Sequence, residues 1–132
     1  MGSTAPHSMT GDFPRRGEIW EARFPDDPKP RPALIVSTDA RNEFAHSVLA
    51  VPITARLRPS PTHVPLHRGE GGLLEDSVAR CENVTLIRKS RLFRAGYSDG
   101  ISVTSLRQVE ACLLPALGIP MINAGPPRVT SR

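Results

Sequence analysis

The 132 residues carry 17 Lys and Arg against 13 Asp and Glu, a formal net charge of +4, and aromatic residues make up only 5% of the chain. This length predicts one domain whose modest core is built from Val, Ile and Leu. The moderate positive charge excludes a histone-like polycation but favours a polyanionic partner. Cys81 and Cys112 lie outside any CxxC or Cys/His cluster, which argues against a zinc site and for two thiols in a cytosolic protein.

Three parts follow one another along the chain. Residues 1–14 predict a disordered leader or tag, residues 15–119 a folded domain, and residues 120–132 a flexible tail of low hydrophobicity. No segment has the length and hydropathy of a membrane span or the pattern of a signal peptide, so we expect a cytoplasmic protein without a membrane partner.

The first two strands are predicted at residues 17–24 and 33–36. Trp20, Ala22 and Phe24 share one face of the first, which alternates, whereas the second is apolar throughout and is expected to be buried on both faces. A Pro- and Asp-containing loop joins them at residues 25–30.

Arg31 lies at the mouth of the second strand, between Pro30 and Pro32, which force extended geometry. A guanidinium held there suits a phosphate, because it is always charged and forks towards two oxygens. The alternative is a solvated arginine that ends a strand, and from this segment alone it is the simpler interpretation.

The polar residues 37–45 predict a turn with Phe44 tucked inward, and residues 47–54 predict a second strongly apolar strand. Pro52 removes a hydrogen-bond donor from that strand, which indicates an edge, a bulge or the strand's end. A basic, Pro-rich loop follows it.

Residues 63–67 alternate, with Val64 and Leu66 inward, so His63 and His67 are expected on a solvated face. These histidines could instead supply an acid–base pair, since imidazole titrates near neutrality. Residues 77–87 predict one long strand or a bent pair. Period two places the following side chains on one face of it: Val78, Arg80, Glu82, Val84 and Leu86.

One helix is predicted near the C-terminus. Ser102 is its N-cap, and Pro115 and Gly118 mark its end. Its apolar stripe consists of Val103, Leu106, Val109, Leu113 and Ala116 or Leu117. Five to seven short strands and one late helix indicate a mainly β fold, a small antiparallel barrel or two curved sheets capped by a helix. Its exposed edges favour a dimer.

Arg31, Thr54, Arg80 and Glu82 form a candidate catalytic set of two cations, one hydroxyl and one carboxylate. This set suits cleavage of RNA by its own 2′-hydroxyl, in which donors stabilise the phosphorane and an acid protonates the leaving 5′-oxygen. No metal or cofactor is needed, because the substrate provides the nucleophile. The alternative is a half-buried Arg80–Glu82 ion pair beside an ordinary strand-end threonine.

Several short strings, in this order and spacing, resemble the MazF/PemK/Kid family of bacterial toxins. They are Arg16-Gly17-Glu18-Ile19-Trp20, Arg31-Pro32-Ala33-Leu34-Ile35-Val36-Ser37, Val51-Pro52-Ile53-Thr54, Thr62-His63-Val64, Asp76-Ser77-Val78, Arg80-Cys81-Glu82-Asn83, Lys89-Ser90-Arg91-Leu92 and Ala116-Leu117-Gly118. The resemblance covers about residues 15–119. The loop at residues 25–30 is several residues shorter than is usual in the family, and Thr85 stands where an arginine is common.

The resemblance implies an SH3-like β-barrel of the CcdB/MazF kind, a homodimer, and a metal-independent endoribonuclease that cuts single-stranded RNA at a short sequence. It also implies inhibition by a cognate, MazE-like antitoxin. Arg31 and Thr54 match the catalytic arginine and threonine of the family, Arg80 matches the additional arginine of the Kid/PemK branch, and Glu82 replaces that branch's aspartate. The residues expected to bind RNA are Glu18, Lys29, Asn42, Arg56 and Asn83.

A second class of function is a non-catalytic one on the same barrel, either a CcdB-like gyrase inhibitor or a nucleic-acid-binding module. CcdB-like proteins act through a terminal Trp-Gly-Ile, whereas this chain has Leu117-Gly118-Ile119 followed by a tail. The joint presence of Arg31 and Thr54 favours the nuclease.

Overall fold

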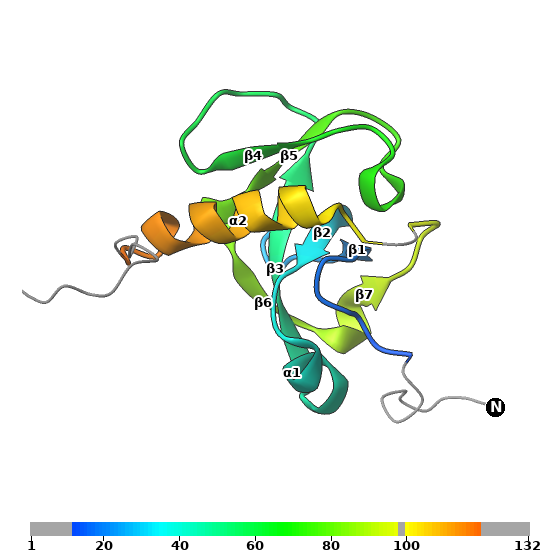
Figure 1. Ribbon diagram of the computed structural model, residues 1–132. Coiled ribbons are helices and arrows are strands. Elements are labelled where there is room, and N and C mark those ends of the chain that lie inside the picture. The colour runs from blue at the N-terminus through cyan, green and yellow to red at the C-terminus, as the bar shows by residue number, and fades with distance from the viewer. Residues whose placement is uncertain (1–11, 98–99, 120–132) are drawn as a thin grey trace, which may run out of the picture.

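The computed structural model describes residues 12–97 and 100–119 (Figure 1). Its elements are β1 (Ile19–Ala22), β2 (Arg31–Ile35), α1 (Asp39–Phe44), β3 (Ser47–Thr54), β4 (His63–Leu66), β5 (Ser77–Arg80), β6 (Thr85–Arg88), β7 (Leu92–Phe93) and α2 (Val103–Ala116), with 3₁₀ turns η2 (Glu70–Gly72), η3 (Cys81–Asn83) and η4 (Lys89–Arg91). Every strand pair is antiparallel. The expected mainly β fold with a C-terminal helix is therefore confirmed.

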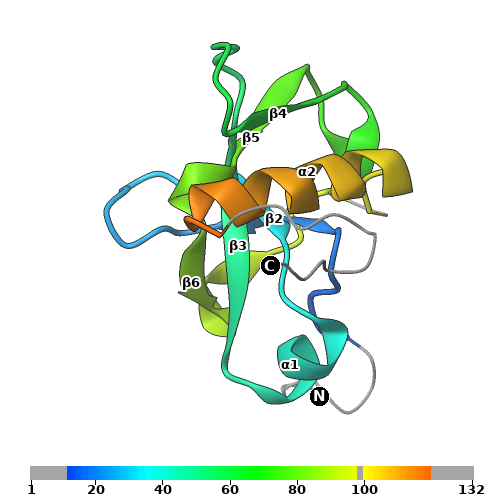
Figure 2. The same ribbon diagram turned by 60° about the vertical axis from the view of Figure 1, so that its left-hand side comes forward.

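The long strand β3 is the centre of the sheet (Figure 2). The strands follow the order β4-β5-β3-β2-β1-β7, and β6 pairs with the first half of β3. One edge of β3 thus pairs with β2, and its other edge pairs first with β6 and then with β5. The ends of β2, β3 and β5 come together as a result.

A register shift separates β5 from β6. Ile53 of β3 lies opposite Ala79 of β5. Ala50 lies three residues before Ile53 in β3, but its partner, Thr85 of β6, lies six residues after Ala79. Turn η3 takes up the three extra residues, so residues 77–88 form the bent pair that the sequence allowed. The prediction that alternate residues from Val78 to Leu86 share one face is wrong, because the turn interrupts the alternation.

Pro52 accounts for the position of this bulge. The Val36 N–H donates to the Leu49 carbonyl across the β2–β3 ladder, so alternation along β3 directs the backbone of Pro52 away from β2 and towards η3. Proline has no N–H to donate there, and the ladder opens at that point. Of the three alternatives that Pro52 predicted, an edge, a bulge or the strand's end, the structure shows a bulge, which lies in the partner segment at η3.

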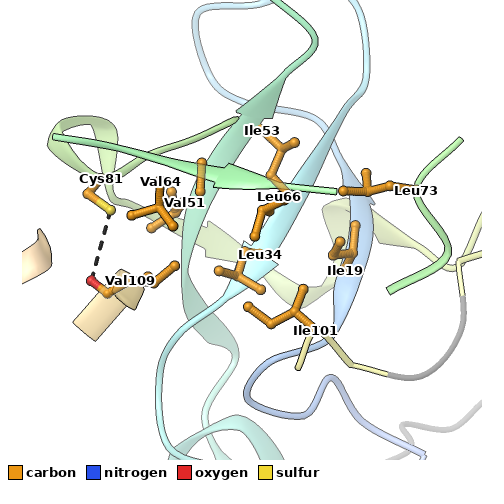
Figure 3. Close-up of a cluster of buried hydrophobic side chains, with 11 residues drawn as sticks. Ile19, Leu34, Val51, Ile53, Val64, Leu66, Leu73, Cys81, Ile101 and Val109 are labelled. Carbon is orange, nitrogen blue, oxygen red and sulfur yellow. Dashed lines mark hydrogen bonds between the residues drawn. The ribbon is translucent and has the colours of Figure 1, made fainter. Parts of the chain in front are cut away.

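Helix α2 covers one face of the sheet, and the main core lies beneath it (Figures 1 and 3). Ser102 caps the helix by accepting a hydrogen bond from the Ser105 N–H at 3.1 Å, as predicted. Val109 is fully buried, but Val103 is 68% exposed and so does not belong to the apolar stripe. The core cluster consists of Ile19, Leu34, Val51, Ile53, Val64, Leu66, Leu73, Ala79, Cys81, Ile101 and Val109.

Helix α1 replaces the turn expected at residues 37–45. The side chain expected to point inward, Phe44, points outward, and a polar side chain is buried instead. Phe44 is 70% exposed, whereas Asn42 is fully buried. The Asn42 amide donates to the Ser37 carbonyl at 3.0 Å. The Lys89 ammonium donates to the carbonyls of Asn42 and Glu43 at the helix end. The free energy gained by hydrogen-bonding the buried amide of Asn42 and the carbonyls at the helix end thus outweighs what burial of the Phe44 ring would contribute.

The two terminal segments lie largely outside the described residues. This applies to residues 1–11 of the expected leader and to the whole expected tail, residues 120–132. Phe13 and Pro14, at the end of the expected leader, are buried. Within residues 12–97 and 100–119, no helix combines the length and the hydropathy that crossing a bilayer requires.

Candidate active site

A pocket of about 610 Å³ opens where the ends of β2, β3 and β5 meet the loop after β1 and turn η3. Three of the four predicted catalytic residues, Arg31, Thr54 and Arg80, line it. The full lining is Phe24, Pro25, Asp26, Asp27, Arg31, Pro52, Ile53, Thr54, Arg56, Arg80, Asn83 and Thr85. The mixture of cations, carboxylates and hydroxyls suits a polar, anionic ligand.

Arg31 is held by a carboxylate of the preceding loop. Its Nε donates to Asp27 Oδ2, and Asp27 Oδ1 accepts the Lys29 N–H at 3.0 Å. The hydrogen bond from Arg31 is the main reason that the pKa of Asp27 lies below its usual value, and the Lys29 N–H lowers it further. Asp27 thus shapes the short loop and orients Arg31 at the same time. The terminal nitrogens of the guanidinium have no partner among the described residues and remain for a ligand.

Thr54 ends β3 between the two arginines. It is half-buried, and its Oγ1 accepts the Arg56 N–H at 3.2 Å. A hydroxyl that accepts from a backbone N–H keeps its own proton for donation. Thr54 can therefore donate a hydrogen bond to an oxygen of a ligand in the pocket.

Arg80 ends β5 on the opposite side of β3 from Arg31. Its Nη2 lies 3.5 Å from Glu82 Oε2. Its Nε is buried and has no hydrogen-bond partner within the part of the chain that the structure describes. A buried donor without a partner is costly.

Glu82 is the centre of a hydrogen-bond network behind Arg80. It accepts the Thr62 hydroxyl at 2.8 Å and faces His63 Nε2 at 3.3 Å. Partial burial raises the pKa of Glu82, but the hydrogen bonds from Thr62, from its own backbone N–H and from His63 outweigh burial and leave the pKa below the usual value. Glu82 is therefore ionised at neutral pH and is a weak base.

His63 departs from the solvated position expected of it. Its side chain is only 12% exposed, with Nδ1 at 3.0 Å from the Arg58 carbonyl. His67, four residues on, is exposed as expected. The alternation of residues 63–67 did not reveal this difference, because the loop before β4 and turn η3 enclose the first histidine only.

The five predicted RNA-binding residues divide into three groups. Arg56 and Asn83 line the pocket, and Lys29 is exposed on the loop beside it. Glu18 lies outside the lining and instead accepts hydrogen bonds from the Trp20 indole and from the Arg94 guanidinium. Asn42 is fully buried, which corrects the expectation that it contacts RNA.

Sequence reasoning missed two residues of this region, Asp26 and Asp27, and it placed a third, His63, on a solvated face. The two aspartates lie in a loop without periodicity, and only the four-residue spacing of Asp27 and Arg31 hinted at a contact. Within residues 12–97 and 100–119, no three His, Cys, Asp or Glu side chains gather closely enough to hold a metal ion.

Solved structures with similar folds belong to toxins and toxin–antitoxin complexes. An "Endoribonuclease in complex with its cognate antitoxin from Mycobacterial species" superimposes with a TM-score of 0.71 at 26% identity, over 83% of this chain and 99% of that one. A MazE–MazF complex from Deinococcus radiodurans gives a TM-score of 0.66 at 23% identity, over 82% and 98% of the two chains.

The sequence comparisons agree with the structural ones. "Endoribonuclease MazF" of Staphylococcus saprophyticus is 33% identical over 64 residues, which are 47% of this chain and 53% of the relative. The chain thus spans about half the length of this curated relative. The family model described as "PemK-like, MazF-like toxin of type II toxin-antitoxin system" matches residues 15–117. The chain therefore belongs to the PemK-like, MazF-like family of toxins of type II toxin–antitoxin systems.

Proposed function

We propose that this chain is a toxin endoribonuclease that cuts single-stranded RNA through the ribose 2′-hydroxyl, without a metal ion. The observation that carries the proposal is the convergence of Arg31, Thr54 and Arg80 on one pocket, from the ends of three neighbouring strands. Family membership and the similarity to endoribonucleases support it.

Two arginines and a threonine suit the transition state of this reaction. When the 2′-oxygen attacks, negative charge develops on the non-bridging oxygens of a pentavalent phosphorane. Arg31 and Arg80, on opposite sides of Thr54, can each donate to those oxygens, and the Thr54 hydroxyl can add a third hydrogen bond.

Three carboxylates are candidates for the group that accepts the 2′-proton. Glu82 was expected in this role, but it lies outside the pocket lining. Asp26 and Asp27 do line the pocket, and Asp27 is bonded to Arg31. We therefore propose that Asp26 accepts the 2′-proton, and that Glu82 has the narrower role of holding Arg80.

The requirement for single strands follows from geometry. The 2′-oxygen, the phosphorus and the leaving 5′-oxygen must come into line, which an A-form duplex resists. Arg56, Asn83 and Lys29 surround the pocket and are the candidates for contacts to the RNA backbone and bases. Cleavage leaves a 2′,3′-cyclic phosphate, or a 3′-phosphate after ring opening, and a free 5′-hydroxyl.

We further propose that the toxin forms a homodimer and binds a MazE-like antitoxin. Leu49 and Leu86 lie opposite each other in the β3–β6 ladder, and they are 38% and 54% exposed. Burying such a pair favours association. Sedimentation that showed only monomer at micromolar concentration would count against the dimer.

The experiment that tests the activity uses one RNA and its matched analogue. An RNA cut by the toxin is remade with 2′-deoxyribose at the cut site only. Cleavage should stop while binding stays nearly intact, and excess EDTA should leave the rate with the all-ribose RNA unchanged. Sequencing the 5′ ends of the fragments identifies the site. Cleavage of the deoxy analogue, or a strict need for magnesium, would overturn the mechanism.

A further inference from the structure

The network behind Arg80 contains an imidazole that the reaction as described does not use. We infer that His63 is a positioning residue, which in its protonated form shares the Glu82 carboxylate with Arg80 and thereby lets Arg80 bind the scissile phosphate while Glu82 orients it. This inference rests on the proposed nuclease function and adds a proton-dependent control to the same pocket.

The contacts of the ring define the protonation state in which the network is complete. Nδ1 lies 3.0 Å from the Arg58 carbonyl, and a carbonyl can only accept, so Nδ1 carries a proton. Nε2 lies 3.3 Å from Glu82 Oε2, and an ionised carboxylate can also only accept. Both contacts are hydrogen bonds at the same time only when both ring nitrogens donate, which is the imidazolium form.

The surroundings connect this proton to the pocket. Among the described residues, the charged groups that face the ring are Glu82 from η3 and Arg80, which pairs with His63 across the β4–β5 ladder. Helix α2, which packs against β4, presents the Cys112 thiol, which donates to the Pro61 carbonyl. One oxygen of Glu82, Oε2, thus serves both His63 and Arg80.

Loss of the proton changes how that oxygen is used. The neutral ring has one proton for two acceptors: a proton kept on Nε2 gives Glu82 a hydrogen bond without the positive charge that strengthens it, and a proton kept on Nδ1 leaves the lone pair of Nε2 facing the carboxylate. Glu82 then turns to Arg80 as its remaining cationic partner and competes with the substrate phosphate for the guanidinium. Turnover should therefore fall as the pH rises through the range of about 5 to 8 in which histidines titrate.

The test compares His63→Gln, His63→Leu and wild type in kcat across that pH range, with thermal unfolding measured on each. A glutamine amide can donate to Glu82 but does not titrate. His63→Gln should therefore retain kcat at acidic pH, and its kcat should not fall as the pH rises. His63→Leu, which has no donor, should lose on the order of tenfold in kcat at acidic pH, the effect of one charge-assisted hydrogen bond. KM should change less than kcat.

His67→Gln is the matched control, because His67 is exposed on the same segment, and its profile should follow that of wild type. A rate that rises with pH, or identical profiles for all folded variants, would overturn the inference. A second readout does not need cleavage: the ring ¹⁵N signals of His63, but not those of His67, should shift in Glu82→Gln. Unchanged His63 signals would refute the contact, whereas a shift without any RNA cleavage by wild type would refute only the nuclease.

Discussion

The two sides of the pocket hold their arginines in different ways. On the β2 side, Arg31 is bonded to Asp27, four residues earlier in the preceding loop. On the β5 side, Arg80 is paired with Glu82, which Thr62 and His63 hold from about twenty residues away. The first arrangement depends on a short proline-bounded loop, and the second on the register of β4 against β5.

One pocket can therefore contain one arginine whose partner does not change with pH and a second arginine whose partner network includes a group that does. Asp27 stays ionised across the neutral range, because the ordinary pKa of aspartate, 3.8, already lies well below it and the hydrogen bond from Arg31 lowers the pKa of Asp27 further. The β2 side therefore does not respond to physiological pH. The β5 side includes an imidazole, the side chain that changes charge in that range. Substitutions on the two sides should therefore differ in size and in pH dependence.

The largest effect is expected on the β2 side. Arg31→Ala should reduce kcat/KM by roughly 100-fold or more, because a preorganised donor to the transition state is lost. Arg31→Lys should restore little, since a point charge does not fork to two oxygens. Arg88→Ala, at an exposed strand end outside the pocket, is the control. Near wild-type cleavage by a folded Arg31→Ala protein would remove Arg31 from the mechanism.

The next prediction separates the two carboxylates. Asp26→Asn should reduce kcat by about 100-fold if Asp26 accepts the 2′-proton. Glu82→Gln keeps an oxygen that can accept from Arg80 and Thr62, so it should cost only about tenfold. Single-turnover kinetics on a short RNA measure both. The reverse order of effects would return the role of base to Glu82.

A smaller effect, with opposite pH behaviour, is expected at Asp27. Asp27→Asn should lower kcat several-fold, as expected when an exposed ion pair that orients Arg31 is weakened. Because the pKa of Asp27 in the folded protein is below 3.8, its ordinary value, its contribution to stability is present above that value and lost as the pH falls through the lowered pKa. The difference in Tm between wild type and Asp27→Asn should therefore vanish in acid. A constant difference down to pH 2 would show that the effect is not electrostatic.

The smallest changes are expected at the rim between the two sides. Arg56→Gln should weaken RNA binding uniformly across sequences and reduce the slope of log K against log salt by about 0.7, as for one lost contact to a single-strand phosphate. Asn83→Ala should instead change which sequences are cut. Binding titrations at several salt concentrations and sequencing of fragment ends distinguish the two. A change of sequence preference in Arg56→Gln would assign base recognition to that residue.

Local patterns in the sequence carry much of this architecture. The alternation around Trp20, the apolar run after Arg31 and the stripe through Val109 each predicted an element that the structure contains. Pro52 predicted an interruption of the ladder, as an edge, a bulge or the strand's end, because a missing N–H affects the ladder wherever the strand is placed. Arg31 could be singled out for a similar reason, since two adjacent prolines restrict its backbone in any fold.

Which side chains meet across strands was decided by tertiary structure alone. Periodicity states which face of a strand a residue occupies, but the three-residue shift at η3 determines that Glu82 turns behind Arg80 and towards His63. The same applies to Asn42, which a polar helix buries because its amide finds Ser37 inside. Hydrogen bonds between distant segments depend on register and enclosure, and neither is encoded in the local spacing of residue types.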